Sequence, residues 1–141
     1  ALQVSAASGF VRAIHPSAAG RADSAPQVAL SVRIPLKTVS ALNAREHWRA
    51  RARRVKGERV TVAWNLAQYA RPSLPCVVTL TRVAPSNGLD SDNLLSSMKG
   101  ARDQIAEWLG VDDRDPLVTW HYAQTRGKPR EYAVLMEVSH V

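Results

Sequence analysis

Four short stretches of this chain have the composition of β-strands, and two longer stretches between them have the period of α-helices. The strand-like stretches are VALSVRIPL from residue 28, CVVTLTRV from residue 76, LVTWHYAQ from residue 117 and YAVLMEV from residue 132. In the first of these, Val28, Leu30, Val32 and Ile34 alternate with small or polar residues, as in a strand that buries one face. The third and fourth are separated by the turn-like TRGKPRE and predict a C-terminal hairpin.

The two helical stretches fix the order of the elements. Between residues 46 and 69 the apolar positions recur at intervals of three and four: Trp48, Ala52, Val55, Val62, Leu66 and Tyr69. The second helix is expected to begin at Asp92 or Asn93, either of which can cap it, and to end at Gly110. The order strand-helix-strand-helix-strand-strand predicts an α+β fold of two layers, in which two helices cover a mixed four-stranded sheet.

The chain divides into a tail and one domain. Residues 1–27 are rich in Ala and Ser and are broken by two glycines and two prolines, so we expect a flexible N-terminal tail. Residues 28–141 form the predicted domain, and 45% apolar residues in a chain of 141 can fill one core. The lone Cys76 cannot form an intramolecular disulfide, and no apolar run is long enough to cross a bilayer. These features predict a cytoplasmic protein without a membrane partner.

The charge is distributed unevenly along the chain. The formal net charge is +7, yet residues 87–115 contain seven of the twelve acidic residues and only three basic ones. A strongly basic chain usually has a polyanionic partner, although charge can also serve solubility alone. An acidic segment in a basic protein indicates a metal site within a nucleic-acid surface.

The acidic segment contains the candidate catalytic residues. Asp90 lies at the end of a predicted strand, Asp92 at the start of a helix, and Asp112 and Asp113 on the loop after that helix. Asp90, Asp92 and either Asp112 or Asp113 can therefore converge on one Mg²⁺. Lys99 is seven residues after Asp92 and returns to nearly the same side of an uninterrupted helix, where it can stabilise charge on a phosphate. The alternative is that Asp92 caps a helix and the Asp112–Asp113 pair forms a turn.

At this point the sequence resembles a known family. The run DSDNL at residues 90–94, a helix that carries a lysine, and GVDDRDP at residues 110–116 resemble the core motif of RusA-type Holliday junction resolvases. The resemblance covers roughly residues 28–138, and Asn43 matches an Asn-bearing loop of the family. It implies a homodimeric endodeoxyribonuclease, common in prophages, that uses Mg²⁺, or Mn²⁺ in its place, to cut four-way junctions during DNA recombination and repair. The residues carried over as catalytic metal ligands are Asp90, Asp92 and Asp113, with Asp112 as the second choice in its pair.

The sequence departs from this family pattern at one position. The family lysine follows the Asp-x-Asp-Asn-Leu run by two residues, where this chain has Ser96. Lys99 lies one turn further along and differs from Ser96 by about 60° around a helix, so its long side chain can compensate in part. The departure leaves a rival hypothesis open, in which the chain binds branched DNA without cutting it.

A second group of candidates lies in the first predicted helix and the loop before it. Such a density of cations suits DNA phosphates, although a solvated helix face gives the same pattern. The predicted DNA-binding residues are Asn43, Arg45, Arg49, Arg51, Arg53, Arg54 and Lys56. The four tryptophans are expected to pack in the core, and Trp48 is the strongest candidate among them for stacking on an unpaired base.

Overall fold

Strand β3 (Cys76–Ala84) is the centre of a mixed sheet. It pairs in parallel with β4 (Val118–Arg126) and antiparallel with β5 (Ala133–His140), which in turn pairs antiparallel with β2 (Val28–Ile34). The computed structural model describes residues 2–5, 28–40 and 45–141, so the prediction for Asn43 and most of the predicted tail lie outside the described residues. The four predicted strands and the mixed sheet are confirmed. The predicted C-terminal hairpin is wrong, because β4 and β5 do not pair with each other and β3 lies between them.

The predicted tail contains one further strand. Residues Leu2–Ser5 form β1, which pairs in parallel with β4 and extends the sheet to the order β1-β4-β3-β5-β2. The tail prediction is therefore wrong for these four residues. Their partners begin at Trp120, more than a hundred residues away, and a pairing of this kind leaves no local signal in the sequence.

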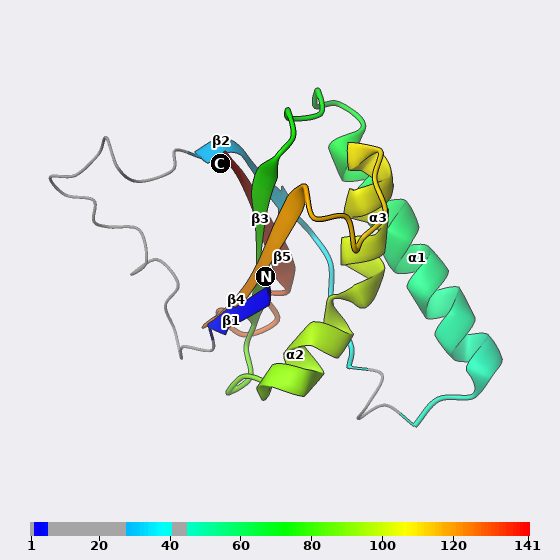
Figure 1. Cartoon of the computed structure of the whole chain (residues 1–141). Coiled ribbons are helices and arrows are strands. Elements are labelled where there is room, and N and C mark those ends of the chain that lie inside the picture. The colour runs from blue at the N-terminus through cyan, green and yellow to red at the C-terminus, as the bar shows by residue number, and fades with distance from the viewer. Residues whose placement is uncertain (1, 6–27, 41–44) are drawn as a thin grey trace, which may run out of the picture.

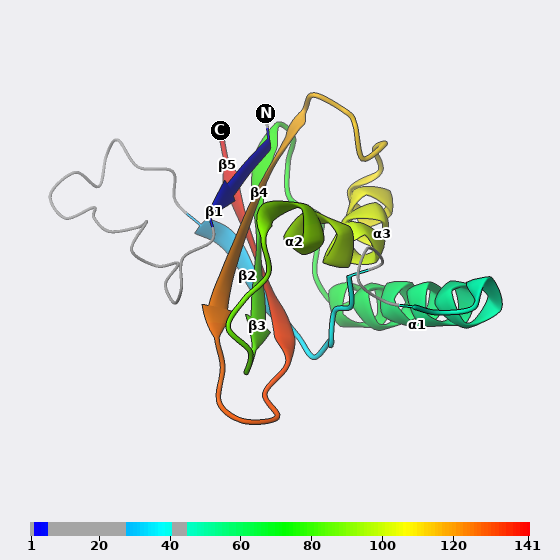
Figure 2. The ribbon, with the colours of Figure 1, turned by 90° about the horizontal axis from the view of Figure 1, so that it is seen from below.

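Three helices cover one face of the sheet (Figures 1 and 2). These are α1 (Trp48–Leu66), α2 (Ser91–Ser97) and α3 (Lys99–Leu109), and none in the described part of the chain is both long and apolar enough to cross a membrane. The core lies between the layers, where the strand residues Val78, Leu80 and Met136 and the helix residues Val62 and Ile105 are fully buried. The first predicted helix is confirmed with slightly shorter bounds.

The second predicted helix is divided in two at Met98. The Met98 N–H donates to the Leu95 and Ser96 carbonyl oxygens, which tightens the last turn of α2, and the Ser97 hydroxyl donates to the Leu94 carbonyl at 2.8 Å. Met98 itself is fully buried, so the break is held by packing. Because the helix is not continuous, the expected phase relation between Asp92 and Lys99 does not hold, and the expectation of two helices is corrected to three.

Candidate functional site

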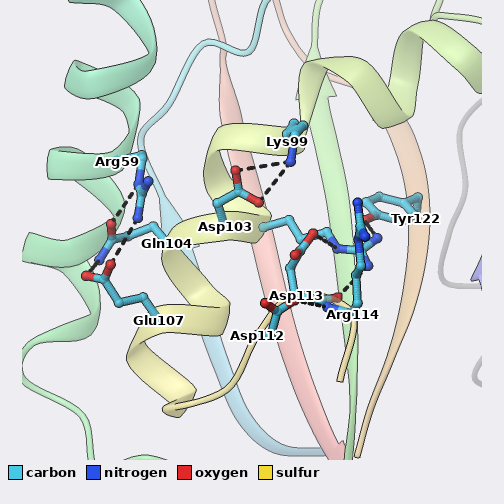
Figure 3. Close-up of polar contacts among 10 residues, drawn as sticks. Arg59, Lys99, Asp103, Gln104, Glu107, Asp112, Asp113, Arg114 and Tyr122 are labelled. Carbon is cyan, nitrogen blue, oxygen red and sulfur yellow. Dashed lines mark hydrogen bonds and ion pairs between the residues drawn. The ribbon is translucent and has the colours of Figure 1, made fainter. Parts of the chain in front are cut away.

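The loop after α3 folds back along the helix that precedes it. Gly110 ends α3 with φ 81°, a left-handed conformation that glycine adopts without strain. The N–H groups of Gly110 and Val111 donate to the carbonyl oxygens of Glu107 and Ala106, each at 3.0 Å. This C-cap turns the chain so that Asp112 and Asp113 lie beside the earlier turns of α3 (Figure 3).

Arg102 fixes the returning loop to both α3 and β4. Its guanidinium donates to the Tyr122 hydroxyl at 2.9 Å and to the Asp113 carbonyl oxygen at 2.6 Å, and its Nε lies 3.6 Å from an Asp113 carboxylate oxygen. It also lies over the Trp120 ring, 4.8 Å from the centroid. Burial raises the pKa of the Tyr122 hydroxyl, so this group stays protonated and accepts the bond from Arg102.

An open hollow of about 390 Å³ lies between the returning loop and α3. Its charged lining comprises Lys99, Asp103, Glu107, Asp112 and Asp113, and Ala106 and Val111 form the rest. The structure therefore brings together three of the predicted residues, Lys99, Asp112 and Asp113. Two further carboxylates, Asp103 and Glu107, line the same hollow and were not among the predicted residues.

The charges in the hollow are partly compensated. Lys99 Nζ lies 3.2 Å from both carboxylate oxygens of Asp103, four residues further along α3. The pKa of Asp112 is lowered, chiefly because its carboxylate accepts the Arg114 N–H at 2.9 Å. Asp112 is consequently ionised and exposed at neutral pH, which is the state that a cation ligand requires.

Asp90 and Asp92 lie at the start of α2 and do not line the hollow. The Asp90 carboxylate caps α2 by accepting the Asn93 N–H at 2.9 Å, and the Asn93 amide donates to both of its oxygens. Asn93 also accepts a hydrogen bond from the Ser40 hydroxyl. Just before Asp90, the Gln124 amide on β4 bonds both the N–H and the carbonyl of Leu89, so the position of Asp90 is set from two sides.

The carboxylates do not form the predicted cluster of three. Within residues 2–5, 28–40 and 45–141 no three His, Cys, Asp or Glu side chains are grouped to hold a metal ion. Mg²⁺ in proteins commonly keeps several waters and uses one or two carboxylates, and the adjacent Asp112 and Asp113 fit that smaller requirement. The lining residues thus fit a water-rich cation site at the hollow, whereas metal binding by Asp90 and Asp92 stays a prediction.

The residues that sequence reasoning missed are those that orient the acidic loop. Arg102 and Tyr122 are twenty positions apart on different elements, and no spacing rule joins them. The Lys99–Asp103 pair has the spacing of four that typifies ion pairs on a helix, so this contact had a signal in the sequence.

The predicted cations of α1 fall into two groups. Arg54 is held by Glu46 at 2.8 Å and by Glu58 at 3.0 Å, and these contacts raise its pKa. The others are exposed and make no ion pair within the described part of the chain: Arg45, Arg49, Arg51, Arg53 and Lys56. The N-terminal half of α1 projects beyond α3 (Figures 1 and 2), and this half carries the exposed cations of the helix.

The prediction that the four tryptophans pack in the core is confirmed for two of them and wrong for the other two. Trp120 is buried and Trp108 packs partly against the core, whereas Trp48 and Trp64 are 65% and 76% exposed. Both exposed rings belong to α1, for different reasons. Trp48 lies where the helix extends beyond α3. Trp64, by contrast, is two residues from each of the buried Val62 and Leu66 and so lies on the other side of the helix.

Comparison with known proteins does not identify a family. No family model matches the sequence. An uncharacterized protein of Xylella fastidiosa (strain Temecula1) is 38% identical over 91 residues, which cover 57% of this chain. The chain spans only 56% of the length of that relative.

Proposed function

We propose that this protein is a Mg²⁺-dependent endodeoxyribonuclease of the RusA type that nicks four-way DNA junctions. The observation that carries the proposal is the hollow in which Lys99 lies with Asp103, Asp112 and Asp113, together with the exposed cations of α1, the helix that packs against α3. An acidic hollow by itself repels phosphate. A cation bound in it would neutralise the carboxylates and let a DNA phosphate approach. Of the two runs that resemble the family, GVDDRDP contributes Val111, Asp112 and Asp113 to the hollow, whereas DSDNL lies at the start of α2.

Each group has a role in the proposed reaction. Asp112 and Asp113 would hold Mg²⁺, or Mn²⁺ in its place, which when bound supplies a more acidic water and neutralises charge on the phosphate. Lys99 offers a mobile positive charge, since its ion pair with Asp103 is exposed and weak. Arg102 holds the Asp113 backbone in place, and the α1 cations bind the DNA backbone without reading bases.

The proposal extends to assembly and location. A four-way junction presents two equivalent strands, so paired nicks require two active sites, and a two-fold symmetric homodimer supplies them. A basic chain with one cysteine and no disulfide suits the cytoplasm of a bacterium, where a prophage would express it.

A second candidate function has its own support. The Asp90 carboxylate is fully engaged in capping α2, and the Asp113 carboxylate lies against Arg102, so neither is free of protein partners. With Ser96 at the position of the family lysine, these contacts favour a protein that binds branched DNA without cutting it.

Cleavage of a synthetic four-way junction separates the two candidates. The nuclease is expected to give paired nicks in Mg²⁺ and none in EDTA, with little cutting of a linear duplex of the same sequence. Tight junction binding without any nick in Mg²⁺ or Mn²⁺ would establish the binding protein instead.

A further inference from the structure

Trp48 continues a core stripe of α1 into solvent. It lies seven residues before Val55 and fourteen before Val62, so the three side chains share one side of the helix. Their burial falls steadily along that stripe, since Val62 is fully buried, Val55 is half-buried and Trp48 is 65% exposed. The ring is exposed because the first turns of α1 project past α3 (Figure 2).

The neighbours of Trp48 are planar and cationic. The His47 ring stacks on it with centroids 5.7 Å apart and planes 28° from parallel, and the Arg49 guanidinium lies 5.0 Å from the indole centroid. Arg45 and Arg51 are close in sequence and exposed. A nucleobase has the same planar shape as these groups and stacks on aromatic rings and on guanidinium planes.

The positive charge around Trp48 favours DNA as the ligand over a second copy of this chain. Two copies of so cationic a helix would repel one another if they met at Trp48, whereas DNA supplies the missing negative charge. A paired duplex presents phosphates, which can bind the cations. Its bases are stacked on one another, so none is available to stack on the indole of Trp48. The ligand that uses both features is DNA with unpaired bases, as at a branch or a bulge.

We propose that Trp48, with His47 and Arg49, forms a binding site for an unpaired base beside the phosphate-binding surface of α1. The inference rests on the proposed function for its substrate, DNA, but not on cleavage. On this proposal, the first turn of α1 makes the protein bind branched DNA more tightly than fully paired DNA.

Binding without metal tests this proposal. Fluorescence anisotropy in EDTA would compare a labelled duplex that carries a short bulge with the same duplex fully paired, for the parent and for Trp48→Ala, Trp48→Phe and Trp64→Ala. A second readout is 2-aminopurine placed in the bulge, whose fluorescence is quenched when it stacks. Trp64 is the matched control, because it is also largely exposed on the same helix but has no aromatic or cationic contact within the described residues.

We expect a loss of affinity only when Trp48 is replaced and only for the bulged DNA. Trp48→Ala should weaken binding of the bulged DNA by about 10- to 100-fold, with less than about a twofold change for the paired duplex and loss of the quenching. Trp48→Phe should retain much of the affinity, and Trp64→Ala should match the parent.

Two results would overturn the inference. One is equal binding of both DNAs by the parent, and the other is an equal loss on both DNAs in Trp48→Ala. Junction cleavage in Mg²⁺ is measured separately, so its failure would remove the nuclease and leave selective binding by Trp48 standing. Failure to bind either DNA would remove both proposals.

Discussion

Arg102 is the residue on which the candidate site most depends. One guanidinium joins α3 to the Tyr122 hydroxyl on β4 and to the backbone and carboxylate of Asp113. Tyr122 is 2% exposed, so its hydroxyl has no ready access to water if this partner is removed. The position of Asp113 is thus tied to the stability of the fold.

Arg102→Ala should lower the free energy of unfolding by about 1–3 kcal/mol, the range for leaving a buried polar group unpaired. Urea unfolding followed by circular dichroism measures this. Arg114→Ala, which removes an exposed side chain from the same loop, is the control and should change stability by less than about 0.5 kcal/mol. A parental midpoint in Arg102→Ala would mean that the loop is held by other contacts.

Lys99→Ala should slow cleavage by about 100-fold, the scale for loss of one preorganised charge stabiliser, with junction affinity nearly unchanged. Single-turnover rates and gel-shift affinities on one preparation give both quantities. Ser96→Lys in this background should recover part of the rate if the two positions serve one role. A parental rate in Lys99→Ala would leave this lysine only its ion pair with Asp103.

At the scale of elements, the sequence predicted the strands and the helical period, which depend on local pattern. It missed the features that depend on packing between elements. Each predicted strand is found within a few residues, because alternation reports which face is buried. The break at Met98 was missed, since neither Met98 nor Lys99 disfavours a helix and the break depends on burial of the Met98 side chain. Periodicity likewise placed Trp48 on the core side of α1. It carried no information on how much of α1 the helix α3 covers.

The projecting half of α1 should supply much of the DNA affinity. Replacing Arg49, Arg53 and Lys56 with Ala should weaken binding to all DNA and reduce the slope of log affinity against log salt by about 0.9 for each phosphate that is no longer neutralised. Arg54 is left in place because it pairs with Glu46 and Glu58. The cations at the end of β4 and in the loop that follows it, Arg126, Lys128 and Arg130, give a control of equal charge. An equal effect from both triple variants would mean that net charge alone attracts DNA.

The contact of α1 with α3 should make stability depend on pH through Glu58. Burial raises the pKa of this carboxyl above its ordinary value of 4.5, and the pair with Arg54 only partly opposes the shift. The folded chain therefore holds this proton more tightly than the unfolded chain, and the stabilisation is greatest below pH 4.5 and is lost as pH rises through the raised pKa.

Urea unfolding of the parent and Glu58→Gln over a pH series isolates this contribution. The stability of the parent relative to the variant should fall as pH rises above about 4.5. Glu46→Gln is the opposing control, because the Arg54 hydrogen bond lowers the pKa of Glu46 and its contribution should be lost as pH falls. If Glu58 behaves like Glu46, the ion pair with Arg54 outweighs burial.

For the whole molecule, the arrangement is a sheet with one helical layer, an acidic hollow on that layer and a cationic helix that extends past it (Figure 1). The sequence predicted an acidic segment and a cationic helix, because each set of charges is clustered along the chain. It could not predict that the hollow collects Lys99, Asp103, Asp112 and Asp113 while Asp90 caps α2, because helix division and loop return decide which carboxylates meet.

The most direct test of the account is single-turnover cleavage of a four-way junction by the parent and by Asp113→Asn, with binding measured on the same preparations. The parent should cut only in Mg²⁺ or Mn²⁺, and Asp113→Asn should bind as tightly or more tightly, because one negative charge is gone, and should cut at least about 100-fold more slowly. Arg114→Ala is the matched control and should retain most of the rate. Cleavage by Asp113→Asn at the parental rate, or cleavage by the parent in EDTA, would contradict a metal-dependent active site at this hollow.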